Sequence, residues 1–230
     1  MVKRESIEFV ESRKALSGLV TKFGGQPVWV GAPQWPLSKS TGKPMRFIGQ
    51  IALGSGMFNP TNAQMAYLFM TDGEEHVDGT WEPDGGENAV ILQPGQAPTI
   101  KTEPLTEGPT LYRMVKKLFH KMLVPQACEF AVKLTAEEDP DFADEAERAK
   151  WDKNDDAKWE AYASALDGNK IGGSPLFIQS TEFPGPGKWR LVLQLDATKV
   201  PFYVNFGDAG VGYLFLSEDG QVAKFLWQCA

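Results

Sequence analysis

The sequence is poor in the residues that most often build catalytic and metal centres. Its 230 residues include two cysteines, Cys128 and Cys229, and two histidines, His76 and His120. Two cysteines cannot form the disulfide framework of a small secreted protein, so we expect a reducing compartment. The four residues are scattered and do not have the spacing of zinc ligands. The sequence therefore predicts neither a bound metal nor a cofactor.

The chain also lacks long apolar runs and an excess of positive charge. No stretch approaches the length that spans a bilayer, and the charged N-terminal segment lacks the apolar core of a signal peptide. Lysine and arginine number 23 against 30 aspartates and glutamates, which gives a net charge of −7. An acidic surface repels phosphate backbones. We therefore expect a cytoplasmic protein that has neither a membrane nor a nucleic-acid partner.

Short catalytic and ligand-binding motifs are absent or incomplete. Residues 152–156 begin like a calcium loop, but Ala157 and Ala163 stand where glycine and a bidentate glutamate belong. Residues 207–212 have the wrong glycine order for a dinucleotide fingerprint. There is no Gly-x-Ser-x-Gly nucleophile elbow. No motif therefore assigns a catalytic residue.

Three segments favour helices. Apolar residues spaced among charges predict a short amphipathic helix within residues 1–18. The apolar spacing of residues 111–123 also indicates a helix, although a strand is left open there. Residues 137–167 hold twelve acidic and four basic residues and predict a helical connector over 136–168.

The most informative feature is an internal repeat. Lys22-Phe23-Gly24-Gly25-Gln26-Pro27 returns as Lys170-Ile171-Gly172-Gly173-Ser174-Pro175. A strand-like segment that contains Gln50 or Gln194 follows, and after it comes a second strand-like segment that begins at Tyr67 or Tyr213. Gly25 and Gln50 lie 25 residues apart, and Gly173 and Gln194 lie 21 apart. Because three words recur in the same order, they indicate a duplicated β-rich unit.

The repeat and the three helical segments together predict an α+β fold. Two related β-rich halves, residues 19–135 and 169–230, would form a mostly antiparallel sheet. The acidic helical segment would join them into one compact unit. Each glycine pair precedes a proline and a strand, whereas a phosphate site requires a helix N-terminus. The glycine pairs therefore indicate architecture.

On these words the chain resembles the YwqG-like family, bacterial proteins of unknown function. The resemblance extends from about Leu19 to the end of the chain. The matching pieces are KFGGQP, Gln34–Pro36, Gly42–Leu53, KIGGSP, Leu191–Asp196 and Phe206–Phe215.

The first copy also resembles the eukaryotic programmed-cell-death-2 group. Members of that group carry metal-binding cysteines between the glycine pair and the glutamine strand. The corresponding loop here, Pro36–Gly42, contains no cysteine, which removes the case for zinc. The resemblance implies chaperone-like binding of a client protein in ribosome assembly. Some bacterial relatives lie beside secreted-toxin genes and have been suggested as immunity partners.

Aromatic and arginine residues near turns give the clearest hint of a binding surface. Tryptophan and arginine are enriched at interaction hot spots. We expect the tryptophans next to turns, Trp35, Trp81 and Trp189, to be the exposed ones. Arg46 and Arg190 begin the glutamine strands.

Four polar residues have two open interpretations. Gln50 and Gln194, if buried, either brace a neighbouring loop or offer an amide to a ligand. Asp196 and Asp208 either form a proton-sharing or cation-binding pair, or end a strand and cap a turn.

We therefore expect a non-enzymatic protein-binding module, either chaperone-like or of the toxin-immunity type. The alternative is a small-molecule binder or an unrecognised hydrolase with a cleft between the repeat halves. The sequence does not determine the oligomeric state. The candidate binding residues are Trp35, Arg46, Gln50, Trp189, Arg190, Gln194, Asp196 and Asp208.

Overall fold

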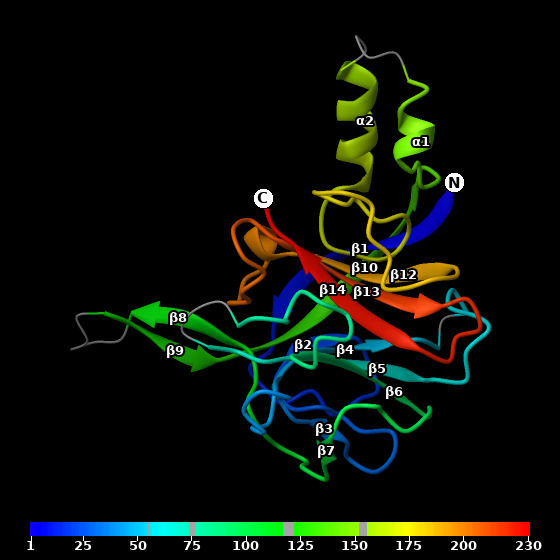
Figure 1. The fold of residues 1–230 in the computed structure, drawn as a ribbon. Coiled ribbons are helices and arrows are strands. Elements are labelled where there is room, and N and C mark those ends of the chain that lie inside the picture. Colours follow the sequence, from blue (N-terminus) through cyan, green and yellow to red (C-terminus); the bar gives the residue numbers. More distant parts are fainter. Residues whose placement is uncertain (55, 74–76, 117–121, 152–155) are drawn as a thin grey trace.

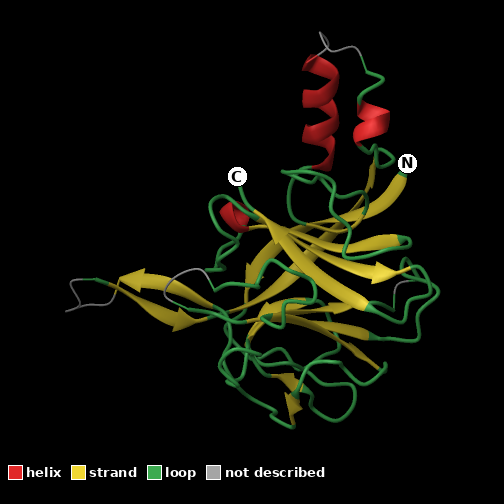
Figure 2. Ribbon diagram, viewed as in Figure 1, coloured by secondary structure: helices red, strands yellow, loops and turns green. Residues whose placement is uncertain are grey.

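The computed structural model describes residues 1–54, 56–73, 77–116, 122–151 and 156–230. The protein is mostly β: 39% of the chain is strand and 8% is helical, as Figure 2 shows. The predicted α+β class is therefore wrong. His76 and His120, which the sequence left without a metal partner, lie outside the described residues.

Ten strands form one antiparallel sheet in the order β14-β13-β12-β11-β1-β10-β2-β4-β5-β6 (Figure 1). Two small two-stranded sheets, β3-β7 and β8-β9, lie outside it. The strands of the large sheet are β1 (Val2–Glu11), β2 (Lys22–Gly24), β4 (Arg46–Ala52), β5 (Met65–Met70), β6 (Asn88–Gln93), β10 (Glu129–Asp139), β11 (Lys170–Gly172), β12 (Trp189–Asp196), β13 (Val211–Ser217) and β14 (Ala223–Gln228).

The repeated words occupy equivalent places in this sheet. Lys22 pairs with Gln50, which pairs with Tyr67, across β2, β4 and β5. Lys170, Gln194 and Tyr213 pair in the same way across β11, β12 and β13. Each half therefore repeats the register of the other.

The N-terminal segment is strand β1 and not the predicted helix. It pairs with β10 over its whole length, from Val2–Asp139 to Glu11–Phe130. This pairing overrides the helical spacing of the apolar residues because β1 gains cross-strand hydrogen bonds to β10 along its whole length. On its other edge β1 pairs with β11, so the N-terminus of the chain belongs to the second half of the sheet.

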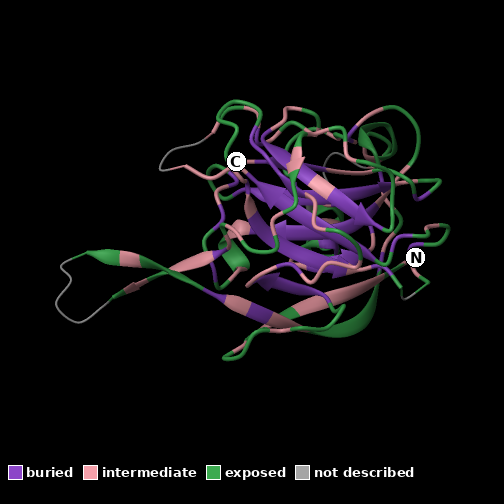
Figure 3. Cartoon of the chain, turned by 90° about the horizontal axis from the view of Figure 1, so that it is seen from below, coloured by how far each residue is buried: buried purple, intermediate pink, exposed green. Residues whose placement is uncertain are grey.

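The predicted helix over 111–123 is also wrong in the described residues. Strands β8 (Tyr112–Lys116) and β9 (Leu123–Ala127) pair and project from the body (Figures 1 and 3). Met114 and Leu123 on this hairpin are exposed. A helix needs its apolar stripe buried against a neighbour, and a projecting hairpin offers none.

The acidic segment is not a continuous helical connector. Strand β10 runs on to Asp139, and the segment then holds the short α1 (Glu145–Arg148) and α2 (Asp156–Leu166), which project together (Figure 1). Trp151 packs against Tyr162 with ring centroids 5.2 Å apart. No helix among the residues the structure describes is long and apolar enough to cross a membrane.

The sheet curls until its two edge strands, β6 and β14, contact each other, which makes it nearly barrel-like. The inner face holds the main core, in which both halves meet through Phe23, Leu68, Leu193 and Leu214. Loops cover the outer face of each half over separate aromatic clusters, one around Phe69 and one around Phe215. We call the gap between β6 and β14 the seam.

Two further strands, β3 (Trp35–Pro36) and β7 (Thr102–Glu103), tie the loops over the first half together. Trp35 is fully buried in the outer cluster and donates its ring N–H to the Met45 carbonyl at 2.7 Å. The expectation that Trp35 is exposed is therefore wrong. A tryptophan beside a turn is buried here because the turn itself folds back onto the sheet.

Candidate functional site

A row of polar side chains crosses the outer face of each half. It consists of Lys22, Gln50, Tyr67 and Gln93 in the first half and Lys170, Gln194, Tyr213 and Gln228 in the second half. All eight are buried. Each row lies under the loop that follows its glycine pair.

The amides and phenols of these rows bind loop backbone. Gln50 accepts from the Val28 N–H at 2.8 Å and donates to the Val20 carbonyl at 3.0 Å. Gln194 accepts from the Leu176 N–H at 2.9 Å and donates to the Gly168 carbonyl at 3.0 Å. Both amides thus have their hydrogen-bonding capacity used by the chain itself, and they bind two different loops.

A β-bulge explains why these glutamines face outward. The register of β4 against β5 shifts between Phe47 and Gly49, and that of β12 against β13 shifts between Leu191 and Leu193. A bulge adds one residue and reverses the alternation of faces. Phe47 and Gln50, three residues apart, therefore both reach the outer face.

The two lysines hold the same loops in place through hydrogen bonds and ion pairs. Lys22 Nζ lies 2.6 Å from Glu129 Oε1 and 2.7 Å from the Gln26 carbonyl oxygen. Lys170 Nζ lies 2.7 Å from each of Asp139 Oδ2 and the Ser174 carbonyl oxygen. Burial lowers the pKa of Lys170 to about 8, against the hydrogen bond and charge of Asp139, which act to raise it.

The glycine pairs turn the chain from β2 and β11 into these loops. Gly24 has a φ of 71°, and a Cβ there would lie 2.2 Å from the Cys128 carbonyl oxygen. Only glycine fits this close approach without moving backbone. Burial raises the pKa of the Cys128 thiol itself to about 11, so it stays protonated near neutrality.

The two candidate arginines lie at equivalent positions but have different surroundings. Arg46 forms an ion pair with Asp72 and lies over the Tyr112 ring, 4.3 Å from its centroid. Arg190 donates to the carbonyls of Asn59, at 2.6 Å, and Ser217, at 3.3 Å. Burial raises the pKa of Asp72 although Arg46 acts to lower it.

The remaining predicted residues do not share a site. Asp196 accepts from the Thr198 N–H at 2.8 Å, and Asp208 is exposed on a loop. Burial alone would raise the pKa of Asp196, but hydrogen bonds from Thr198 and Lys199 hold it below its ordinary value. Trp189 donates to the Gly185 carbonyl at 3.0 Å and is half-buried. The structure thus shows no cleft shared by Gln50, Gln194, Asp196 and Asp208, all of which lie in the described residues.

A groove does lie at the seam. A cavity of about 280 Å³ is lined by both edge strands, including Val90 of β6 and Ala223 of β14, and by the loop 96–100. It shares Leu92, Gln96 and Gln221 with a cavity of about 270 Å³. It shares Asp84, Thr99 and Ile100 with one of about 500 Å³. We call these three connected cavities the seam groove.

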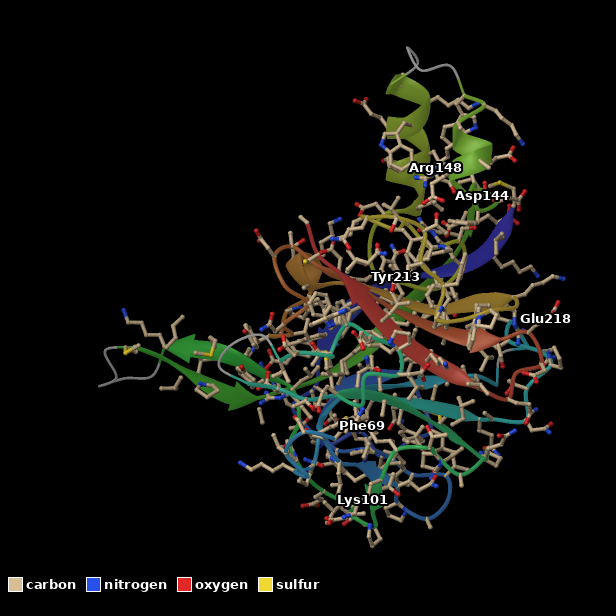
Figure 4. The ribbon with its side chains drawn as sticks, viewed as in Figure 1. Phe69, Lys101, Asp144, Arg148, Tyr213 and Glu218 are labelled. Atoms are coloured by element: carbon tan, nitrogen blue, oxygen red, sulfur yellow. The ribbon has the colours of Figure 1, made fainter. Side chains whose placement is uncertain are left out.

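The seam groove has an apolar middle and charged margins. Val90 and Val222 line its centre, and Val222 is 40% exposed. Lys224 and Asp84 form an ion pair across the seam. Lys39 and Lys101 line the largest cavity, and Figure 4 places Lys101 among the loops outside the first half. The groove is thus a concave surface bounded by both halves.

Sequence reasoning placed a site between the halves but chose none of the residues of the seam groove. Val90 and Val222 look like ordinary apolar residues, and only the closure of the sheet brings both of them to one cavity. The proline- and glycine-rich stretch from Pro94 was a usable signal, because it interrupts the strands and forms one wall of the groove.

Among the residues that the structure describes, no group of three or more His, Cys, Asp or Glu side chains could hold a metal ion. The fold and groove define a duplicated, mostly β protein with a concave surface where its halves meet. Residues 21–225 match the family described as a domain of unknown function, DUF1963, and the chain belongs to that family. No curated protein matches the sequence.

Proposed function

We propose that this chain is a non-enzymatic, YwqG-like protein-binding module, chaperone-like or of the toxin-immunity type, that binds its partner in the seam groove. The observation that carries this proposal is the continuity of three cavities along the line where β6 and β14 meet. A long, open, partly apolar groove suits a polypeptide better than a compact metabolite.

The margins of the groove support the same function. Apolar contact area from Val90, Val222 and Ile100 supplies affinity, and charged residues at the rim supply orientation. Backbone hydrogen bonds hold one wall of the groove together: Leu37 donates its N–H to the Lys101 carbonyl at 2.9 Å, and Lys39 donates its N–H to the Gly86 carbonyl at 3.0 Å. A preformed groove lowers the ordering cost of binding.

Site-specific photocrosslinking in the native host tests the proposal. A benzophenone amino acid at Val222 should capture one defined protein, whereas the same group at Leu134, which does not line the groove, should not. With that protein purified, Val222→Glu should weaken binding at least about tenfold without lowering the free energy of unfolding. Equal capture from both positions would refute the groove as the binding site.

A second cavity favours the alternative of a small-molecule binder. About 310 Å³ in volume, it is lined by Met57 and Phe58 of the first half and by Phe183 and Arg190 of the second. The aromatic walls suit the apolar body of a small ligand, and the guanidinium suits a negatively charged group on it. In a thermal-shift screen, Met57→Arg should abolish any ligand-induced rise in Tm there, whereas Val222→Glu should leave it intact.

A further inference from the structure

The start of β4 has an edge that faces away from β5, and loops of the first half bind it. Met45, just before β4, donates its N–H to the Pro36 carbonyl at 3.0 Å. Phe47, within β4, donates its N–H to the Pro109 carbonyl at 2.8 Å. Both N–H groups point away from β5, because residues of an antiparallel pair alternate between bonding to the partner strand and facing away from it. The chain itself therefore supplies the acceptors for this edge.

The equivalent edge of β12 lacks such acceptors. Glu218 donates its N–H to the Lys188 carbonyl at 3.0 Å, which fixes that pair as hydrogen-bonded at the start of β12. Because pairs alternate, Trp189 and Leu191 direct their N–H groups away from β13. Strand β11, on that side, pairs with β12 no further than Leu193. Within the described part of the chain, neither N–H donates to a loop or to a side chain.

This edge of β12 lies at the second cavity. Trp189, Arg190 and Leu191 line the cavity, as do residues 172–175, and Leu191 is 4% exposed. The N–H of a buried residue gains a hydrogen bond from an acceptor placed beside it. A ligand oxygen there would take the position that the Pro109 carbonyl has on β4. The volume of about 310 Å³ is at the lower end of the range for ligand pockets, so the cavity suits a small molecule.

The charges around the second cavity select an anion. Of the described residues that line it, Lys3 and Arg190 are the charged ones. Lys3 has no ion-pair partner in the described part of the chain. Arg190 binds backbone carbonyls, whereas Arg46, at the equivalent position, has a carboxylate partner. Glu218, which lies near Arg190, is itself paired with Lys188. A negatively charged ligand therefore complements this cavity.

We propose that the second cavity binds a small carboxylic acid with an apolar body. One carboxylate oxygen accepts from the Leu191 N–H, and the other meets the Arg190 guanidinium. The apolar body lies against Met57, Phe142 and Phe183. Phe142 and Phe183 pack edge to face with ring centroids 5.5 Å apart, so they form one aromatic wall. This inference rests on the small-molecule alternative of the proposed function and specifies the class of ligand.

NMR titration of the wild-type protein with three apolar acids, hydrocinnamate, naphthylacetate and octanoate, is the test. At least one acid should shift the backbone amide resonance of Leu191, because its N–H gains a charged acceptor. The Phe47 amide is the matched control, since it already donates to Pro109 and should not move. The primary amide of the same acid keeps the apolar body and should bind at least about tenfold more weakly. An unmoved Leu191 amide, or equal binding of acid and amide, overturns the inference.

Variants of charged residues locate the carboxylate. Arg190→Gln keeps a hydrogen-bond donor but removes the charge, and it should weaken binding of the acid at least about tenfold. Lys133→Gln, at an exposed residue that does not line the cavity, should leave binding unchanged. The comparison of acid and amide on the wild-type protein measures the same contribution if Arg190→Gln does not fold. Unchanged binding by a folded Arg190→Gln variant overturns the inference.

The ligand class and the function on which it rests fail in different ways. If a neutral ligand raises Tm, Met57→Arg abolishes the rise and the Leu191 amide does not move, the cavity binds a small molecule and the carboxylate is wrong. If crosslinking at Val222 captures a partner and none of the three acids binds, the protein-binding function stands without this site. A hexapeptide that ends in phenylalanine and binds more tightly than the acids would overturn the inference in favour of the C-terminus of a partner protein.

Discussion

At the scale of single residues, the ion pairs of the buried lysines Lys22 and Lys170 are the features on which stability depends most. Lys170 and Asp139 are both fully buried, and their ion pair is completed by backbone carbonyls. Asp139→Asn leaves Lys170 without its counter-charge and should cost about 3–5 kcal/mol in the free energy of unfolding, measured by urea denaturation.

Two further variants check that reasoning. Lys170→Met combined with Asp139→Asn should recover part of the loss, because Lys170 then leaves no unpaired charge, and Arg4, the other partner of Asp139, keeps its ion pair with Glu137. Glu8→Gln, which breaks the exposed Lys133 pair, should cost less than about 1 kcal/mol. If Asp139→Asn costs no more than Glu8→Gln, the buried Lys170–Asp139 ion pair contributes little to stability.

The phenol of Tyr67 makes stability depend on alkaline pH. Burial raises the pKa of Tyr67 from 10.0 to about 12, with the hydrogen bond that its phenol accepts from the Val30 N–H acting the other way. The folded state therefore keeps a proton that the unfolded state loses, and this contribution is full below pH 10 and lost as pH rises toward 12. The difference in unfolding free energy between wild type and Tyr67→Phe should shrink over that window.

A matched variant controls for the loss of any phenol. Tyr203 lies at the surface, with its ring centroid 5.2 Å from that of Tyr112, and Tyr203→Phe removes a phenol that is not part of the buried row. Its unfolding free energy should follow that of the wild type between pH 10 and 12. A constant wild-type to Tyr67→Phe difference over this range would contradict the proposed role of the buried proton.

At the scale of elements, apolar spacing misled wherever pairing decided the structure. Residues 1–18 and 111–123 both had helical spacing, yet β1 pairs along its length with β10 and β8 pairs with β9. The repeated words were more reliable because glycine, proline and glutamine act locally: Gly24 requires a positive φ, and Gln50 requires backbone partners. Long-range pairing leaves no such local mark.

The β8–β9 hairpin can be distinguished from the predicted helix by mutation. In the hairpin, Leu111 is fully buried at the base, whereas Met114 and Leu123 are 45% and 54% exposed. Leu111→Ala should therefore cost about 2–5 kcal/mol, and Met114→Ser with Leu123→Ser within about 0.5 kcal/mol each. In a helix packed through its apolar stripe, Met114→Ser would cost nearly as much as Leu111→Ala. Thermal and urea unfolding measure the difference.

At the scale of the whole molecule, the sequence revealed the duplication but not how the halves exchange strands. The repeat begins at Lys22 and Lys170, so it contained no information about β1 or β10. In the sheet, N-terminal β1 joins the second half through β11, and β10 joins the first half through β2. The curling that brings β6 to β14 depends on this continuous sheet, so the seam groove could not be located from the words alone.

This exchange makes the N-terminus essential to the second half. Removing residues 1–11 strips β10 and β11 of a shared neighbour and exposes the long edge of β10 and the short edge of β11. We expect the shortened chain to aggregate or to lose a cooperative unfolding transition, as measured by calorimetry and light scattering. A synthetic peptide of residues 1–18 should restore the transition, because the strand binds in trans through the same register.

The sequence of the restoring peptide decides whether that register is responsible. Ile7 and Phe9 pack against the inner core from β1, and Phe9 lies 5.3 Å from the ring centroid of Phe23. A peptide with Ile7→Asp and Phe9→Asp keeps the backbone donors but should fail to restore folding, since its buried face is lost. If the shortened chain unfolds at the wild-type midpoint, each half is self-sufficient. The sheet would then be two domains in contact, and the seam groove would be an interface between domains that can move apart.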